Sequence, residues 1–204
     1  MPSLLFYLAK RYHHGELRQA LLDAVDLIVR TKGSDSVTLR ECARLAGVSH
    51  AAPLHHFKDH HALLSAYVAW KWIGVAESMR ARREAAGDDP FSVLTAIGMA
   101  YIECGMTTPG LFGLLLRPDL CPRPGSEGFE NGAKAAHDEL VHAVARCAGR
   151  EDDGLVELAW SAVHGFVELQ LLGGVILWEE KAATMIGRMR PIFLGNEESS
   201  IDNM

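Results

Sequence analysis

The chain lacks the features that mark several classes of protein. Its four cysteines, Cys42, Cys104, Cys121 and Cys147, form no CxxC pair, and this spacing favours reduced thiols over a disulfide framework or a zinc finger. No apolar run reaches the ~18 residues that a membrane span needs. The apolar opening MPSLLFYLAK has neither the basic start nor the small-residue cleavage site of a signal peptide. We therefore expect a cytoplasmic protein with no membrane partner, and we assign no role to residues 1–10.

The sequence also lacks the short motifs of common enzymes. It contains no GxSxG elbow, no P-loop, no GxGxxG after a strand and no HExxH helix. Hydrophobic residues make up 49% and charged residues 23% of the 204 residues, which is an ordinary globular composition and excludes a disordered or low-complexity chain. We predict a protein that is not an enzyme and that uses no cofactor.

Basic residues are scarce overall but unevenly distributed. The net charge is −6, yet residues 1–68 contain 8 Lys/Arg and 6 Asp/Glu, whereas residues 69–204 contain 12 and 20. Seven of the ten histidines also lie in residues 1–68, and protonation of these would make the segment strongly basic. The asymmetry indicates an anionic partner for the first part of the chain, although a solvated face with clustered charges is the alternative.

Apolar residues recur with a helical period, and no stretch alternates for long enough to indicate a strand. Thr38, Ser49 and Asp59 are expected N-caps, and Gly33 and Gly149 are expected helix ends. We predict an all-α fold of about nine helices, followed by a disordered tail from residue 195. The expected helices cover approximately residues 14–31, 39–46, 50–56, 60–85, 91–106, 111–117, 130–147, 155–172 and 179–189.

The stretch from Thr38 to Lys58 has the spacing of a helix-turn-helix. Thr38 and Glu41 fit a capping box, and Gly47 allows a tight turn between two short helices. Ser49 would cap the following helix, whose exposed start would enter the major groove of DNA. On spacing alone, an ordinary helical hairpin is the alternative.

Several segments resemble a known family. The stretches YHHGELR at residues 12–18, ALL at residues 20–22, TLRE at residues 38–41, GVS at residues 47–49 and HF at residues 56–57 are similar to the N-terminal domain of TetR-family transcriptional regulators. The segment WSAVHG at residues 160–165 resembles the signature of the WHG-type C-terminal domain in that family. The resemblance implies an all-α homodimer. Residues 1–60 would form a three-helix DNA-binding domain, and residues 61–204 a helical bundle for ligand binding and dimerisation.

The resemblance also implies which residues would contact double-stranded DNA. Thr38 would contact phosphate, Arg40 a phosphate or a base edge, and the start of the third helix would face the bases. The full set is Thr38, Arg40, Ser49, His50, Ala51, Ala52, His55, His56 and Lys58.

Two positions depart from the family pattern. The family has Tyr at the position of Leu54 and Lys at that of His60, and both usual residues hold phosphate. Leucine cannot donate a hydrogen bond, and histidine is mostly neutral above pH 7. A helical small-molecule-binding protein with a weakened DNA-binding module is therefore an alternative function. His56 and His60 could share a helix face as metal ligands, but the expected break at residues 57–59 spoils that geometry, so we predict no metal site.

The second part of the chain has the composition of a ligand-binding bundle. Bulky residues with few polar atoms line such pockets, although an ordinary core uses the same residues. The candidates for ligand binding are Trp70, Met99, Phe112, Leu116, Trp160 and His164.

The last two expected helices are candidates for the homodimer interface, an assignment that the resemblance favours over simple closure of the core. Their apolar positions are Leu155, Leu158, Ala162, Phe166, Leu169, Ile176, Met185, Ile186 and Met189. Together these observations predict a ligand-responsive repressor that binds a pseudo-palindromic operator as a dimer and is released by a small, largely apolar effector.

Overall fold

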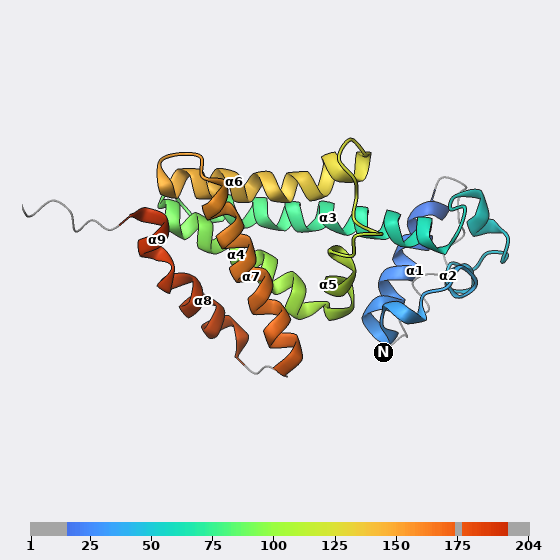
Figure 1. Cartoon of the computed structure of the whole chain (residues 1–204). Helices are drawn as coiled ribbons and strands as arrows, with labels where there is room; N and C mark the ends of the chain where they lie inside the picture. The colour runs from blue at the N-terminus through green and yellow to red at the C-terminus, as the bar shows by residue number, and fades with distance from the viewer. Residues whose placement is uncertain (1–15, 174–176, 196–204) are drawn as a thin grey trace, which may run out of the picture.

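The computed structural model of the chain describes residues 16–173 and 177–195, which contain helices and no strand (Figure 1). The all-α prediction is confirmed. The α-helices are α1 (Leu17–Lys32), α2 (Leu39–Leu45), α3 (His60–Ala85), α4 (Pro90–Thr107), α5 (Pro109–Leu115), α6 (Lys134–Ala148), α7 (Asp153–Gly173), α8 (Trp178–Arg188) and α9 (Arg190–Leu194). Short 3₁₀ segments η2 (Ser34–Ser36) and η3 (Ala52–His55) and a π-helical segment η4 (Phe129–Ala133) complete the described part.

The long helix α3 connects the two ends of the molecule. α1 and α2 lie at one end, on the right in Figure 1, and α3 runs from there along α6 toward the end that holds α9. α3 packs against α4, α6 and η4, while α4 packs against α7 and α8. The body of the protein is thus a bundle through which α3 extends into the N-terminal helices.

The N-terminal helices fold around the apolar stripe of α1. Leu21, Val25 and Ile28 are buried there, and Phe57 closes the same core from the other side. The Thr38 hydroxyl accepts a hydrogen bond from the Glu41 amide at 3.1 Å, so the predicted N-cap is present. The Glu41 carboxylate instead pairs with cationic side chains, so only half of the capping box forms.

The expected third helix at residues 50–56 is shorter than predicted. Only Ala52–His55 is helical, and it is a 3₁₀ turn with bonds such as that from the Leu54 amide to the Ala51 carbonyl at 3.1 Å. The buried Pro53 has no amide hydrogen and cannot add an α-helical bond. The Ser49 side chain makes no capping bond; its carbonyl accepts from the Ala52 amide at 3.0 Å.

The remaining helix signals agree closely with the structure. The Asp59 carboxylate accepts from the Ala62 amide at 2.8 Å and starts α3. Gly149, with a φ of 69°, ends α6 in the left-handed conformation that favours glycine. The sequence did not predict α9, in which Pro191 occupies the first turn, a position that tolerates its missing amide hydrogen. The expectations for residues 1–15, Ile176 and the tail from residue 196 lie outside the described residues.

Helix α7 has an unusually apolar surface. It is 21 residues long and, by length and composition alone, apolar enough to cross a membrane, but Glu157, His164 and Glu168 interrupt it, so it is not the continuous apolar run whose absence was noted in the sequence. One side packs against α4, α6 and α8. On the other side Leu169 and Leu172 are 67% and 83% exposed, which leaves an apolar face that no described residue covers.

Candidate DNA-binding face and effector cavity

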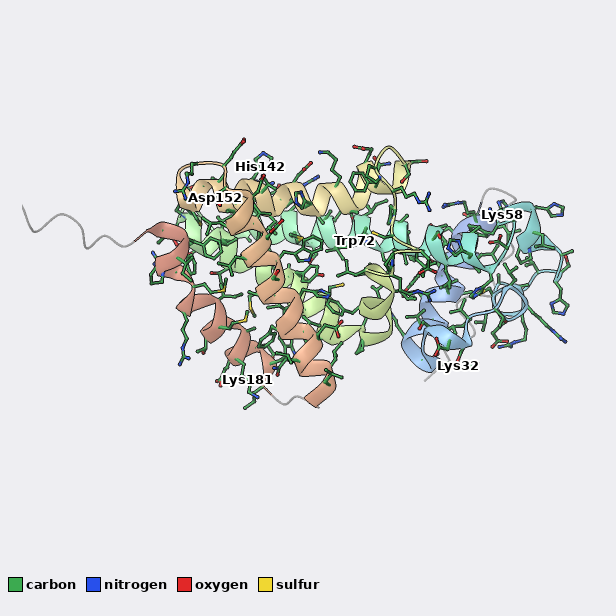
Figure 2. All side chains as sticks on the ribbon, viewed as in Figure 1. Lys32, Lys58, Trp72, His142, Asp152 and Lys181 are labelled. Atoms are coloured by element: carbon green, nitrogen blue, oxygen red, sulfur yellow. The ribbon has the colours of Figure 1, made fainter. Side chains whose placement is uncertain are left out.

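The residues predicted to contact DNA lie on the surface of the N-terminal helices. All nine are exposed except Ala52, which is half-buried. They extend from the start of α2 through the turn at residues 49–51 and η3 to the loop before α3. Figure 2 shows Lys58 at the same end of the molecule as Lys32, far from Lys181 and Asp152. The fold therefore brings these side chains to one end of the protein.

Charge on this face is partly neutralised. The Glu41 carboxylate pairs with Arg44 at 2.8 Å and with Lys32 at 3.1 Å. Hydrogen bonds from Arg44 and Lys32 lower the pKa of Glu41 to about 2. Within the described ranges, Arg40 and Lys58 make no ion pair or side-chain hydrogen bond. These two cations are therefore available to an external anion.

The two departures from the family pattern are both at the surface. Leu54 lies within η3 and is 56% exposed, and His60, the first residue of α3, is also exposed. An exposed leucine adds apolar contact surface but no hydrogen-bond donor. Any side-chain hydrogen bond to a DNA phosphate near η3 must therefore come from residues next to Leu54.

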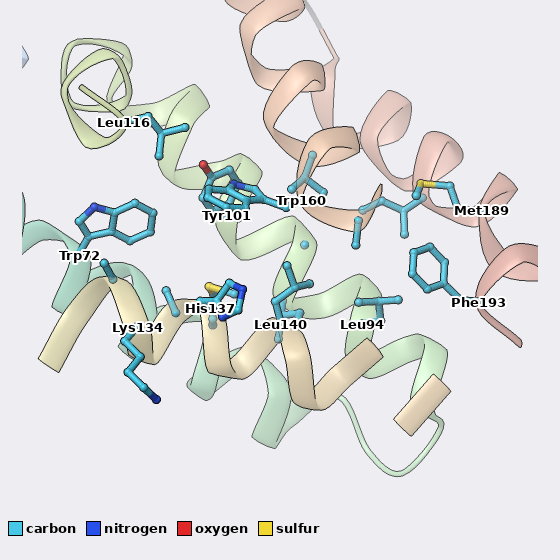
Figure 3. A pocket seen from close by; sticks show the side chains of 18 of the residues that line it. Trp72, Leu94, Tyr101, Leu116, Lys134, His137, Leu140, Trp160, Met189 and Phe193 are labelled. Atoms are coloured by element: carbon cyan, nitrogen blue, oxygen red, sulfur yellow. The ribbon is translucent and has the colours of Figure 1, made fainter. Parts of the chain in front are cut away.

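The helical bundle encloses a cavity of about 320 Å³ between α3, α4, α6 and α7, with α8 and α9 closing one end (Figure 3). This volume is at the lower end of the range for sites that bind small molecules. Its principal lining residues are Trp72, Met79, Leu94, Ile97, Tyr101, Leu116, His137, Leu140, Trp160, Val163, Met189 and Phe193.

The structure places two of the six predicted ligand residues, Leu116 and Trp160, in the cavity wall. Trp70 instead lies against Lys71, with the ammonium 4.9 Å from the ring centre, on the side of α3 that faces α1. Residues two apart on a helix point in different directions, and so Trp72, not Trp70, lines the cavity.

The other three predicted ligand residues pack beside the cavity. Phe112 is buried and stacks on His164, with ring centres 4.8 Å apart. Met99 is half-buried against the core, and the spacing of Leu94, Ile97 and Tyr101 marks the opposite, cavity-facing side of α4.

Sequence reasoning missed the contribution of η4 and α6. His137 and Leu140 of α6 line the cavity, together with Phe129 of η4. η4 approaches α3 closely because Gly132 has no side chain: a Cβ there would lie 2.8 Å from the Trp72 Cβ and 2.9 Å from the Ile73 amide nitrogen. No local signal in residues 129–133 indicates which helix they contact.

One polar cluster borders the cavity. The Tyr101 hydroxyl lies 3.1 Å from Nδ1 of His164, whose Nε2 is 3.9 Å from the Glu168 carboxylate. Burial raises the pKa of Tyr101 to about 12, although a hydrogen bond from Trp160 acts in the opposite direction. Burial also lowers the pKa of His164, against the effect of Glu168. Both Tyr101 and His164 are therefore uncharged at neutral pH.

Two sets of polar contacts connect the bundle to the N-terminal helices. In the first, the Asp26 carboxylate of α1 accepts from the Tyr67 hydroxyl and the Lys71 ammonium of α3, each at 2.9 Å. Burial raises the pKa of Asp26, but the hydrogen bonds from Lys71 and Tyr67 outweigh it and hold this pKa below its usual range.

The second set begins at Arg117, which directly follows the cavity residue Leu116 in the chain. Arg117 pairs with Asp119 at 2.7 Å, and Asp119 lies 3.8 Å from Nε2 of His61 in the first turn of α3. Leu116 in the cavity wall is therefore three residues before Asp119, and Asp119 contacts the start of α3 next to η3.

Comparison with known proteins agrees with this architecture. The family model for the tetracyclin repressor-like C-terminal domain matches residues 94–189. The chain is also 37% identical over 81 residues to the HTH-type transcriptional regulator BetI of Serratia proteamaculans, a match that covers 39% of this chain and 41% of that protein. The chain is thus similar to TetR-family regulators. It spans about two fifths of the length of the curated relatives that it matches.

Solved structures share the fold along most of the chain. A protein of unknown function from Rhodococcus sp. RHA1 has a TM-score of 0.73 and 28% identity, with 91% of this chain and 97% of that chain covered. A TetR family regulator from Marinobacter aquaeolei VT8 has a TM-score of 0.61 and 16% identity, with 86% and 94% covered. The finer assignment to the WHG type of C-terminal domain stays a prediction.

Proposed function

We propose that this chain is a cytoplasmic, ligand-responsive repressor of the TetR family. It binds a pseudo-palindromic operator as a homodimer and releases it when a small, largely apolar effector enters the cavity. In this proposal residues 1–60 bind DNA, and residues 61–204 bind the effector and form the dimer.

The observation that carries the proposal is that one helix serves both sites. Trp72 and Met79 of α3 line the cavity, while Tyr67 and Lys71 of the same helix hold Asp26 of α1. A ligand that shifts α3 would therefore shift α1, and with it the DNA-binding face. An effector acts in this way only to the extent that it prefers one position of α3 over the other.

The DNA-binding half of the proposal is supported by the exposed residues around η3 and by the unpaired cations. Arg40 can donate two hydrogen bonds to a guanine, the commonest specific contact in the major groove. Lys58 would add an electrostatic contact that positions the protein without reading sequence. In a dimer, two such faces would enter successive major grooves about one helical turn apart.

The dimer half of the proposal is supported by the apolar face of α7. Leu158, Leu169 and Leu172 are all exposed there. Pairing of α7 and α8 with their counterparts across a two-fold axis would bury these side chains in a four-helix interface. A large uncovered apolar patch on a single chain is itself typical of an interaction site.

The test is a fluorescence anisotropy titration of the full chain with DNA from the flanks of its own gene and with a scrambled duplex, at two salt concentrations. We expect tight binding to the native DNA that weakens as salt rises, because phosphate contacts release counterions. Equal binding to both duplexes, or binding to neither, would contradict the regulator and favour the small-molecule-binding alternative.

A further inference from the structure

The walls of the cavity disfavour a charged ligand. Lys134 is the one Lys or Arg among the lining residues, and its ammonium is paired with Asp138 at 2.6 Å. Figure 3 shows the Lys134 side chain extending away from Tyr101 and Trp160. His137 is exposed to solvent. A buried anion would therefore have no partner inside the cavity, and burial of an unpaired charge is strongly unfavourable.

The two lining tryptophans cannot accept a hydrogen bond from a ligand. The indole N–H of Trp72 donates to the Leu115 carbonyl at 3.3 Å, and Trp160 lies beside the Tyr101 hydroxyl. An indole offers only a donor, so neither side chain can serve a ligand that donates. The Tyr101 oxygen is therefore the atom to consider.

The neighbours of Tyr101 fix the direction of its hydrogen bonds. Glu168 lies toward Nε2 of His164 at 3.9 Å, and a carboxylate there favours the tautomer with its proton on Nε2. Nδ1 is then an acceptor, so that the Tyr101 hydroxyl donates to it across 3.1 Å. The Tyr101 oxygen has two acceptor sites, and the indole N–H of Trp160 can occupy only one of them, so one is left for a ligand.

We propose that the cavity binds an uncharged, mainly apolar compound that carries one hydrogen-bond donor, such as a phenol, and that the Tyr101 oxygen accepts this donor. This inference rests on the proposed function, because it specifies the chemical class of the effector. Tyr101 then determines specificity, and the apolar walls provide the rest of the affinity.

The experiment compares three probes by isothermal titration calorimetry with the full chain at neutral pH. 4-Propylphenol carries the donor, 4-propyltoluene replaces the hydroxyl with a methyl group of similar size, and 4-propylbenzoate carries a negative charge. In the wild type we expect both uncharged probes to bind and the benzoate to bind most weakly. In Tyr101→Phe the preference for the phenol over the toluene should fall by roughly 5-fold or more, because the ligand hydroxyl loses its partner.

Two controls keep the result interpretable. Retained binding of 4-propyltoluene by Tyr101→Phe shows that the cavity is intact, and Ser65→Ala, which removes a hydroxyl group outside the cavity wall, should leave the phenol preference unchanged. An unchanged preference in Tyr101→Phe, or tightest binding of the benzoate, would overturn the inference and leave the effector cavity in place. If no probe binds the wild type, the inference falls together with the effector half of the proposed function. The DNA titration tests the other half independently.

Discussion

At the residue scale, Arg40 and Arg44 differ in what they offer to DNA although both lie on α2. Arg44 is held by Glu41 at 2.8 Å, whereas Arg40 makes no such pair in the part of the chain that the structure describes. A guanidinium already bonded to a carboxylate must break that pair before it can bind a base or a phosphate. We therefore expect Arg40 to contribute most of the specific contact energy from α2.

Replacement of Arg40 tests this expectation. Arg40→Ala should weaken binding to the operator by about 1–3 kcal/mol and relax selectivity at one base pair, because a bidentate contact to guanine is lost. The measurement is anisotropy with the operator and with single-base variants of it. The control is Arg123→Ala, an exposed arginine far along the chain in the loop after α5, which should have no effect. Unchanged affinity in Arg40→Ala would remove this residue from the contact set.

The histidines of the same face predict a pH dependence. His50, His55 and His56 are exposed, and protonated histidine side chains would add positive charge next to the DNA phosphates. We therefore expect operator affinity to rise when the pH is lowered from 8 to 6. The triple variant with Gln at these three positions should give a flatter profile. A wild-type profile as flat as that of the variant would show that these side chains do not contribute charge to binding.

At the element scale, the contact between α1 and α3 depends on one carboxylate. Asp26 accepts from Arg30, Tyr67 and Lys71, and these partners keep its pKa below the ordinary value in the folded protein. An acid with a lowered pKa stabilises the fold above the pKa of the unfolded chain, and this stabilisation disappears as the pH falls through the folded value.

Asp26→Asn should therefore be less stable than the wild type at pH 7, by about 1–3 kcal/mol for the loss of charge-assisted hydrogen bonds. The difference should shrink as the pH falls toward 3, where the wild-type carboxyl is also becoming protonated. Urea unfolding at pH 7 and at acid pH measures both quantities. A difference that stayed constant with pH would mean that the ionised form of Asp26 does not stabilise the fold.

The packing of η4 on α3 makes a second prediction at this scale. Gly132→Ala should destabilise the protein by about 1–3 kcal/mol, because the added methyl group meets atoms that cannot move freely. Those atoms include the backbone nitrogen of Ile73, at 2.9 Å. The matched control is Gly74→Ala on the exposed side of α3, where a Cβ meets nothing within 4 Å and the better helix propensity of alanine should stabilise by about 0.5–1 kcal/mol. Equal effects in thermal melts would contradict the close approach of η4.

At the scale of the whole molecule, we propose that a second copy of the chain covers the apolar face of α7, which no described residue covers. Replacement of both Leu169 and Leu172 with Glu should convert a dimer into a monomer in sedimentation experiments, because buried carboxylates would have no partner across the interface. Leu54→Glu, which changes an exposed leucine at the other end of the molecule, should leave the dimer intact. A wild-type chain that is monomeric at micromolar concentration would contradict the interface.

The sequence predicted the elements better than their contacts. Caps such as Asp59 and end signals such as Gly149 are local, and so the helices that they delimit were identified correctly. The length of the third helix was overestimated. The short segment between Ser49 and the buried Phe57 contains Pro53, which has no amide hydrogen, and only a 3₁₀ turn forms there. The residues of the cavity wall were predicted only in part. Trp70 and Trp72 are the same residue type, and only the direction in which each side chain points from α3 decides that Trp72 lines the cavity.

The central claim, that the chain reads DNA sequence as a symmetric dimer, is tested most directly by selection of binding sites from a randomised duplex pool, followed by sequencing. The account predicts enrichment of a pseudo-palindrome whose half-sites are centred about one helical turn apart. Failure of any sequence to be enriched over the starting pool would contradict it.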